Sequence, residues 1–359
     1  MWAHPRQIPR HGYDFGRSKH FQRPHSYRKN RNSIHATFYA PSPRNYRKRT
    51  SKRRSDCLKH RKMLTVSDVY NRLKSSLIEI YNDKAESSAV LHRVFEYLTG
   101  LPFTDVTVHP EKEVDTTFET IENVLVRIKK SEPLEYIFNR AEFLDLELYT
   151  ESSVLIPRPE TEELAVMVSD YLKQRESGLK IIDIGTGSGC IPIYLALQHP
   201  ENKFFACDIS DKALSTAKKN AQKYSVKNLE IFYADILNYD KNEILNNLEF
   251  DVIISNPPYV TDSEKPLMAH NVIDYEPHTA LFVPDSNPLL FYKKISEFAA
   301  SHLSSGGKIY FEINERFGNE TIQMLEEYEF TNVSIMKDLF GKDRMAVGEW
   351  QNLDRIPKS

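Results

Sequence analysis

The chain has 359 residues, which is enough for two domains, a tail and a large buried core. No apolar run approaches the roughly 18 residues of a membrane span, and no secretory signal pattern is present. The three cysteines, Cys57, Cys190 and Cys207, lack paired spacing, so we expect no disulfide framework, no metal site and a reducing compartment. Cys190 and Cys207 lie in apolar sequence and are predicted to be core residues.

The charges are distributed unevenly. Of 48 Lys+Arg and 50 Asp+Glu, residues 1–62 hold 18 and 2, which leaves 30 and 48 in the remainder, so the two parts carry +16 and −18. Residues 1–62 also contain scattered prolines and no apolar periodicity, which predicts a basic disordered extension. It is interpreted as a targeting peptide, a basic arm for RNA or the ribosome, or sequence upstream of a true start at Met63. We favour the last, because folded-looking sequence begins directly after Met63.

Residues 63–140 are predicted to form a small helical domain. Thr65 suits a helix N-terminus, and apolar residues recur at helical spacing from there to Ile80. Further helices are predicted over about 86–98, ended by Gly100, and over about 117–130. The domain offers no chemistry of its own, so we expect it to recognise a substrate or cover a cleft.

Residues 141–162 are predicted to be a hairpin linker. Residues 142–148 alternate like a strand, and residues 154–156 are expected to return as its partner. Two prolines then flank Arg158 in a stiff loop, and Thr161 with its acidic neighbours suits the start of a helix that runs to about Leu172. The alternative is a rigid linker that ends in an ordinary cap.

A doubly wound domain is predicted over 163–355. It opens with a strand at 180–184 and a helix from Cys190, joined by a loop of sequence Gly185, Thr186, Gly187, Ser188 and Gly189. Glycines let a ligand approach the backbone closely, and a helix N-terminus offers free N–H groups. The spacing is tighter than the dinucleotide fingerprint, although that ligand stays possible from the loop alone. Asp183 would repel a pyrophosphate but suits the cationic amino-acid end of S-adenosylmethionine.

The next two strands also end in acids. Asp208 follows a strand at 204–207 and suits ribose hydroxyls. Asp235 follows a strand at 229–233 and suits an adenine amino group, while Ile236 would pack on the ring. Each aspartate alone is as easily a helix cap or a solvated turn. Three successive strand ends that carry acids favour a cofactor site.

The stretch Ser255-Asn256-Pro257-Pro258-Tyr259 follows a buried strand at 250–254. Prolines cannot extend a strand, and they hold the backbone stiffly. The side-chain carbonyl of Asn256 and the main-chain carbonyl of Pro257 then become fixed acceptors beside the flat ring of Tyr259. Two acceptors and a ring suit a planar NH2 group. The alternative is a turn that ends a strand.

Residues after Tyr259 are predicted to be irregular to about 287. His278 lies there and resembles a general base, but methyl transfer to an amide needs none, so we expect a structural role. Helices at 288–303 and 317–328 and strands at 308–313, 333–336 and 345–350 complete about seven strands. The fold class is therefore α/β, a seven-stranded Rossmann-like domain, with the last two strands as an antiparallel edge.

Over about 63–350 the chain resembles the PrmC/HemK family of release factor glutamine methyltransferases. The resemblance rests on four segments, namely 156–162 (IPRPETE), 183–189 (DIGTGSG), 256–259 (NPPY) and 276–281 (EPHTAL). It implies a class I methyltransferase fold, S-adenosylmethionine as cofactor, and methylation of the glutamine amide in the Gly-Gly-Gln loop of class 1 peptide chain release factors.

The resemblance also assigns residues. Its cofactor contacts fall on Gly185 to Gly189, Asp208, Ile236 and Asn256, and many members have an aromatic where this chain has Ile236. Its catalytic and substrate contacts fall on Asn256, Pro257, Pro258 and Tyr259. Arg158, in the first segment, is a further candidate for substrate binding.

Two other functions fit parts of the sequence. An amino-group methyltransferase that acts on adenine or guanine in RNA or DNA would use the same tetrapeptide, but the −18 body disfavours a phosphate backbone. A non-enzymatic factor that binds RNA through residues 1–62 would not need the acids and glycines. We expect a monomer that acts in the cytoplasm, or in mitochondria if residues 1–62 are a transit peptide, with no membrane partner.

Overall fold

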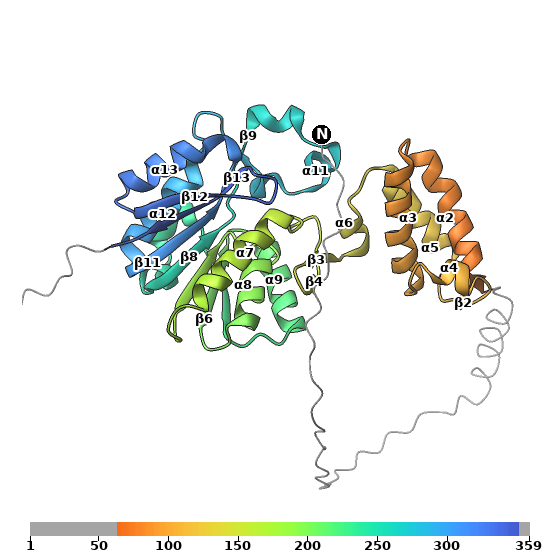
Figure 1. Ribbon diagram of the computed structural model, residues 1–359, viewed down its shortest axis with the longest axis horizontal. Coiled ribbons are helices and arrows are strands. Elements are labelled where there is room, and N and C mark those ends of the chain that lie inside the picture. Colours follow the sequence, from red (N-terminus) through yellow and green to blue (C-terminus); the bar gives the residue numbers. More distant parts are fainter. Residues whose placement is uncertain (1–62, 352–359) are drawn as a thin grey trace, which may run out of the picture. The chain divides into compact units, whose positions relative to one another are not determined.

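The computed structural model describes residues 63–351 (Figure 1). The predicted basic extension, 1–62, and the last residues of the predicted 163–355 domain lie outside that range. The domain limits at 140 and 162 stay predictions. The helices and strands predicted within 63–351 all fall in the described range.

The N-terminal helices form where the sequence predicts them. Helix α2 (Val66–Ile80) begins at a capping box in which the Thr65 side chain and Asp68 satisfy each other's backbone N–H groups. Helix α3 (Lys84–Thr99) ends at left-handed Gly100, and α5 (Phe118–Lys129) begins after Thr117. Short helices α4 (Asp105–Val108) and α6 (Leu134–Phe138) and a small pair of strands, β1 (Leu64–Thr65) and β2 (Glu113–Val114), complete the group.

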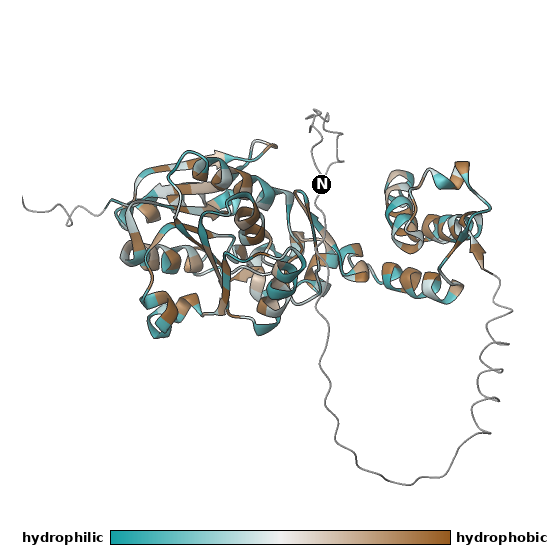
Figure 2. Ribbon diagram, turned by 90° about the horizontal axis from the view of Figure 1, so that it is seen from below, coloured by the Kyte–Doolittle hydropathy of each residue, from teal (hydrophilic) through white to brown (hydrophobic). Residues whose placement is uncertain are grey.

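The helices share one apolar core. Each of α2, α3 and α5 has an apolar side and a hydrophilic side, which Figure 2 shows as brown and teal. The apolar sides meet in a cluster whose fully buried members include Val66, Val69, Leu73, Leu77, Val94, Phe95 and Ile121. Burial of this stripe, rather than helix propensity alone, holds the three helices together.

The hairpin in the predicted linker is formed by other residues than the sequence suggested. Strands β3 (Ala141–Phe143) and β4 (Leu146–Leu148) pair with each other, so the predicted single strand at 142–148 is wrong. The chain turns at Leu144, which has a φ of 51° and whose amide donates to Glu162 Oε1 at 2.9 Å. The predicted partner, 154–156, is an irregular segment and not a strand. Its Val154 carbonyl accepts a hydrogen bond from the Tyr136 hydroxyl.

The central sheet has seven strands in the order β12-β13-β11-β8-β5-β6-β7, which confirms the predicted fold class. The parallel strands are β5 (Lys180–Ile184), β6 (Lys203–Asp208), β7 (Leu229–Tyr233), β8 (Phe250–Ser255) and β11 (Leu303–Glu312). β12 (Thr331–Lys337) and β13 (Asp343–Glu349) form the predicted antiparallel edge. The order reverses between β5 and β8, and ligands bind beside such a switch point at the carboxyl ends of the strands.

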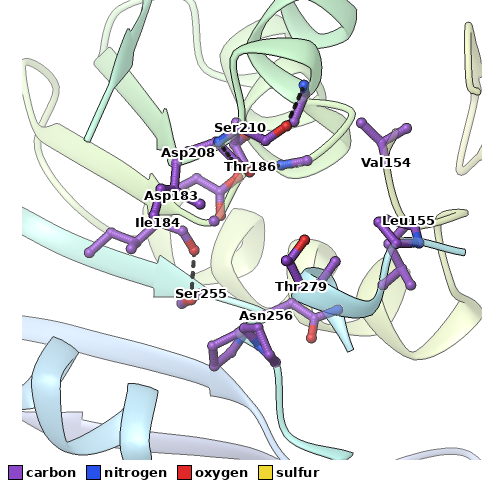
Figure 3. Close-up of a pocket in the computed structure, with 18 of the residues that line it drawn as sticks. Val154, Leu155, Asp183, Ile184, Thr186, Asp208, Ser210, Ser255, Asn256 and Thr279 are labelled. Carbon is purple, nitrogen blue, oxygen red and sulfur yellow. Dashed lines mark hydrogen bonds between the residues drawn. The ribbon is translucent and has the colours of Figure 1, made fainter. Parts of the chain in front are cut away.

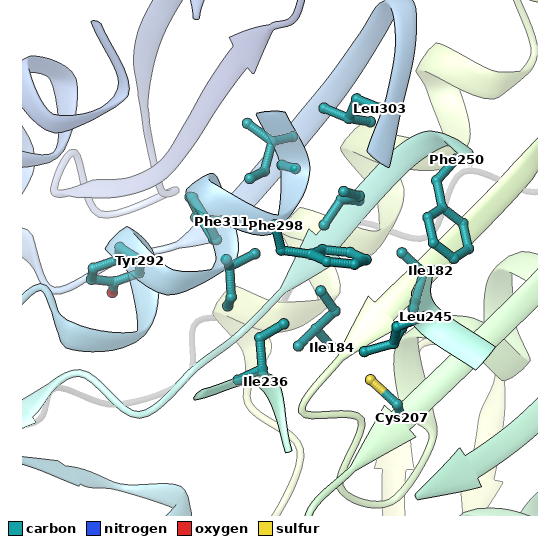
Figure 4. Close-up of a cluster of buried hydrophobic side chains, with 14 of the residues drawn as sticks. Ile182, Ile184, Cys207, Ile236, Leu245, Phe250, Tyr292, Phe298, Leu303 and Phe311 are labelled. Atoms are coloured by element: carbon teal, nitrogen blue, oxygen red, sulfur yellow. The ribbon is translucent and has the colours of Figure 1, made fainter. Parts of the chain in front are cut away.

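Helices cover both faces of the sheet. α7 (Pro159–Leu172), α8 (Cys190–Gln198) and α9 (Asp211–Lys223) pack on one face, with Ile181, Phe204 and Ile254 from the strands. α12 (Leu290–His302) and α13 (Gly318–Glu327) pack on the other, where Figure 4 shows Phe298 of α12 among Ile182, Ile184 and Phe250. Cys190 and Cys207 are buried, which confirms that they are core residues.

The segment after Tyr259, predicted to be irregular, is ordered. It begins with β9 (Val260–Thr261) and ends with β10 (Phe282–Val283). These two strands pair in parallel, so the two ends of the segment lie side by side. Between them lie η2 (Asp262–Leu267), α11 (His270–Tyr275) and η3 (His278–Ala280). Elsewhere the short elements are η1 (Ile236–Lys241), α10 (Glu243–Asn246) and η4 (Glu315–Phe317). The prediction missed this order because it depends on a pairing between residues far apart in the chain.

Gly189 offers a test of helix packing. Its φ is +80°, and an added Cβ would lie 3.0 Å from Ile193 Cδ1 and 3.1 Å from Ala217 Cβ, between α8 and α9. We expect Gly189→Ala to lower the free energy of unfolding by about 2–4 kcal/mol, from backbone strain and overpacking together. Gly178→Ala is the matched control, because Gly178 has a φ of +88° with nothing within 4 Å of an added Cβ. Gly178→Ala should lower the free energy of unfolding, measured by urea denaturation, by only about 1–2 kcal/mol. Equal losses would contradict the packing argument.

Candidate active site

A cavity of about 390 Å³ lies at the carboxyl ends of β5, β6 and β8, beside the switch point of the sheet (Figure 3). The structure brings together at this cavity most of the residues predicted from the sequence, namely Arg158, Asp183, Gly185, Thr186, Gly187, Ser188, Asp208, Asp235, Ile236, Asn256, Pro257 and Pro258. Two predicted residues, Gly189 and Tyr259, are not among those that line it. Gly189 instead packs against α9, as described above.

Asp183 is the most unusual group at the cavity. Its side chain is 2% exposed, and neither carboxylate oxygen has a hydrogen-bond partner among the described residues. The Thr186 hydroxyl lies nearby but outside hydrogen-bonding geometry. Burial raises the pKa of Asp183 to about 7; the neighbouring Thr186 hydroxyl acts against that rise, and the charge of Asp208 adds to it. A buried carboxylate without a partner destabilises the free protein, so the position suits a ligand that brings a positive charge.

The glycine loop is held in shape by β6. The amides of Gly185 and Thr186 donate to the Cys207 carbonyl at 2.9 and 3.0 Å, and the Gly187 amide donates to Asp208 Oδ2 at 2.9 Å. Gly185 and Gly187 have positive φ, and an added Cβ would meet nothing within 4 Å at either. The loop therefore leaves room beside its backbone, which a ligand can fill.

Asp208 lines the cavity and also accepts hydrogen bonds that hold the backbone around it. Its two oxygens accept from the Gly187 and Ser210 amides, and burial raises its pKa. A carboxylate has about four acceptor positions, so two backbone bonds leave capacity for ribose hydroxyls. Its predicted role as a ribose acceptor fits this geometry and stays a prediction.

Asp235 and Ile236 stand at the end of β7. Asp235 caps η1, because Oδ1 accepts from the Leu237 amide at 2.9 Å and Oδ2 from Asn238 Nδ2 at 2.7 Å. Asp235 is therefore a helix cap, as the alternative interpretation of the sequence had it. Only the lone pairs of its carboxylate that these two bonds leave over are available to an adenine amino group. Ile236 is 9% exposed and lines the cavity as apolar surface.

Asn256 is oriented by Thr161, which the sequence suggested only as part of a helix start. Its Nδ2 donates to Thr161 Oγ at 3.0 Å, and the Thr161 hydroxyl donates to Glu312 Oε2 at 2.6 Å. Thr161 thus donates its proton to Glu312 and accepts from Asn256, so the NH2 group of Asn256 faces Thr161. This order fixes which way the Asn256 amide faces. No hydrogen bond to Asn256 Oδ1 or to the Pro257 carbonyl is present among the described residues, so both oxygens remain acceptors.

The predicted helix start near Thr161 and its end near Leu172 are confirmed. Arg158 occupies the N-cap position of α7, with no side-chain capping bond, and Thr161 lies inside the first turn. The sequence did contain one sign of the other missed residue. Glu312 stands in the apolar strand β11 and is 1% exposed, and a carboxylate in such a place requires partners.

Tyr259 faces Glu312 rather than the cavity. Its hydroxyl donates to Glu312 Oε1 at 3.0 Å, and its ring packs against the core below the sheet's carboxyl edge. Tyr259 is not among the residues that line the cavity, and the stacking of its ring on a substrate amide stays a prediction. Burial, followed by the charge of Glu312, raises the pKa of Tyr259, so the hydroxyl stays protonated and keeps donating.

Arg158 is tied to the segment that closes the other side of the cavity. Its Nη2 pairs with Glu276 Oε1, and Glu276 Oε2 accepts from the Ile156 amide at 3.2 Å. Glu276 is 1% exposed in its side chain, whereas Arg158 is 30% exposed. Two of the segments that carry the family resemblance thus hold each other. Direct binding of substrate by Arg158 stays a prediction.

His278 does not take part in the cavity. It is exposed, its Nε2 is 2.8 Å from the Ile273 carbonyl, and its ring lies edge-on to Phe282. This agrees with the structural role expected from the sequence. Across the described residues, no three His, Cys, Asp or Glu side chains gather in a way that would bind a metal ion. None of the helices between residues 63 and 351 has the length and apolar character of a membrane span.

Comparison with known proteins identifies the family. The methyltransferase small domain family matches residues 165–279. A release factor glutamine methyltransferase of Flavobacterium psychrophilum is 41% identical over 288 residues, which cover 79% of this chain and 98% of that protein. The chain belongs to the release factor glutamine methyltransferase family. A second member, from Bacteroides thetaiotaomicron, is 42% identical over 63% of this chain and 78% of that protein.

A solved structure bears a related name. The protein-(glutamine-N5) methyltransferase (release factor-specific) from Alicyclobacillus acidocaldarius matches 55% of this chain and 95% of that chain, at 24% identity and a TM-score of 0.34. The assignment to the family rests on the sequence relatives and not on this match. Membership makes the protein an S-adenosylmethionine-dependent methyltransferase.

The residues at the cavity fit that cofactor. The unpartnered carboxylate of Asp183 suits its cationic amino-acid end, and the open backbone of Gly185 and Gly187 leaves room beside it. Asp208 retains acceptor capacity for the ribose, and Ile236 gives an apolar surface for the adenine. These residue assignments are proposals, and the fit lies in the chemistry of the groups.

The Asp183 assignment predicts a pH dependence. With a pKa near 7 when folded and about 4 when unfolded, Asp183 binds its proton more tightly in the folded protein. The free energy of unfolding should therefore fall as the pH rises through this window. We expect Asp183→Asn to raise the melting temperature of the cofactor-free protein by several degrees at pH 8 and hardly at all at pH 4. The same variant should bind S-adenosylmethionine more weakly in calorimetry. An equal change in melting temperature at both pH values would contradict the buried charge.

Proposed function

We propose that this enzyme methylates the side-chain amide nitrogen of the glutamine in the Gly-Gly-Gln motif of class 1 peptide chain release factors. The observation that carries the proposal is the orientation of Asn256. Thr161 and Glu312 hold its NH2 group, which leaves Asn256 Oδ1 and the Pro257 carbonyl as acceptors beside the cavity. Two fixed acceptors match the two hydrogens of a carboxamide. The relatives' names supply the identity of the protein substrate.

The chemistry requires orientation more than acid or base. An amide nitrogen is a poor nucleophile because its lone pair is delocalised into the carbonyl. S-adenosylmethionine, when bound, supplies a methyl group made electrophilic by the attached sulfonium. Asn256 Oδ1 and the Pro257 carbonyl would accept the two N–H hydrogens of the substrate and direct the lone pair of the nitrogen. Such placement contributes up to about 7–11 kcal/mol to lowering a barrier.

The same two oxygens stabilise the developing charge. Positive charge appears on the substrate nitrogen as it is methylated, and two preorganised acceptors lie where it forms. The Pro257–Pro258 backbone is stiff, so these oxygens need little reorganisation. The proton leaves the nitrogen afterwards, to water. His278 is outside the cavity and is not needed as a base.

We also propose that the enzyme works as a monomer in the cytoplasm, on a protein and not on nucleic acid. The part of the chain after residue 62 carries a net charge of −18, which disfavours a phosphate backbone. A mitochondrial location would depend on residues 1–62, which lie outside the described residues.

Asn256→Ala should separate this function from its alternatives. The wild type should transfer labelled methyl to a purified class 1 release factor and not to RNA, and mass spectrometry should place it on the Gly-Gly-Gln glutamine. Loss of one preorganised polar contact costs about 2–4 kcal/mol, so Asn256→Ala should lower kcat roughly 30- to 1000-fold. The melting temperature should hardly change.

The control substrate is a release factor in which that glutamine is replaced by alanine, which should accept no methyl group. Transfer to RNA but not to the release factor would refute the proposed substrate. Wild-type turnover by Asn256→Ala would refute the role of Asn256.

A further inference from the structure

We propose that the loop between β12 and β13, residues 338–342, docks the protein substrate through Leu339 and Phe340. We call these residues the Leu-Phe tip. The inference rests on the proposed function, because it assigns the tip to the same protein substrate. Leu339 is 82% exposed and Phe340 is 75% exposed, among the most exposed large apolar side chains of the described residues. Single exposed apolar side chains are common, whereas apolar surface that is continuous and exposed marks sites of interaction, and these two side chains are adjacent.

The tip is rigid and not a frayed loop. The Asp338 carboxylate accepts from the amides of Phe340 and Lys342 at 2.9 and 3.0 Å, and from Arg344 Nε at 3.4 Å. The side chains of Asp338 and Arg344 are only 1% and 12% exposed. Gly341, with a φ of +79°, completes the turn. A buried ion pair and a tight turn thus fix a loop that presents two apolar side chains to solvent, and a preorganised loop loses little entropy on binding.

The tip lies at the same edge of the sheet as the cavity. β12 is antiparallel to β13, which is antiparallel to β11, so the carboxyl end of β12 points the same way as those of β5 and β8. The Leu339 amide donates to Glu163 Oε1 at 3.4 Å, and Glu163 stands in the second turn of α7. Arg158 and Thr161, at the start of the same helix, line the cavity. A protein whose glutamine enters the cavity would therefore meet the tip.

The surroundings of the tip indicate the chemistry of the partner surface. Glu163, which accepts from the Leu339 amide, is an acid beside the tip; burial raises its pKa, the Leu339 amide acts against that rise, and the charges of Asp338 and Glu160 add to it. Arg344 and Lys342 already pair with Asp338 and Glu315. An apolar pocket with a basic rim complements this arrangement, whereas a phosphate backbone does not. We therefore assign the tip to a protein surface of that kind on the release factor.

The test compares whole release factor with a short peptide that carries the Gly-Gly-Gln motif. Leu339→Ser combined with Phe340→Ser should raise KM for the release factor about tenfold or more, the scale of losing interface anchors, with kcat hardly changed. Activity on the peptide and affinity for S-adenosylmethionine should stay at the wild-type level. Glu163→Gln should raise KM for the release factor by a smaller factor. At high salt, which screens charges, its KM should equal that of the wild type.

Leu197→Ser is the matched control, because Leu197 is an exposed leucine, 38%, near the C-terminal end of α8 and so away from the cavity. It should leave KM unchanged. Direct binding of release factor to each variant gives a second reading that does not need peptide turnover. An unchanged KM and affinity in the double variant would overturn the inference while leaving the proposed function intact. Failure of the wild type to methylate release factor would instead overturn the proposed function. Dimerisation of the wild type that the double variant abolishes would assign the tip to self-association and overturn the inference too.

Discussion

The arrangement of the active site depends on one buried carboxylate. Glu312 stands at the end of β11, is 1% exposed, and accepts hydrogen bonds from Thr161 of α7 and Tyr259 of the Asn-Pro-Pro-Tyr segment. It therefore joins three parts of the chain that meet only in the folded protein. Burial raises its pKa, and these two hydrogen bonds and Arg344 act against that rise. Loss of either partner would leave a buried acceptor unsatisfied, so the three parts hold one another in register.

At the cofactor end of the cavity, in contrast, the buried carboxylate makes no hydrogen bond to any described residue. Asp183 is buried without a partner, and the glycine loop leaves its backbone open, so this end is costly until a ligand arrives. Functional sites often contain groups that destabilise the free protein in this way. At the substrate end, hydrogen bonds through Thr161 to Glu312 hold the NH2 group of Asn256, whereas the cofactor end lacks a positive charge. The contrast explains how one cavity can orient a weak nucleophile and still bind a cationic donor strongly.

Local patterns predicted much of this structure, and long-range contacts account for what they missed. Helices such as α2 follow from Thr65 and apolar spacing, and the strand ends that carry Asp183, Asp208 and Asp235 follow from short sequence segments. The turn at Leu144 was missed because leucine disfavours a positive φ, which here is held by Glu162 of α7. Thr161 and Glu312 meet across 151 residues of sequence, which no local pattern reports. The hydrogen bond between Tyr259 and Glu312 was missed for the same reason.

Thr161 acts on the reaction through Asn256, and a double-mutant cycle on kcat distinguishes this route from an independent contribution. The rate of methyl transfer to release factor would be measured for the wild type, Thr161→Val, Asn256→Ala and the double variant, with melting temperatures to confirm folding. We expect Thr161→Val to lower kcat when Asn256 is present and to have almost no further effect once Asn256 is alanine. Losses that simply add would contradict it, because Thr161 would then contribute independently of Asn256.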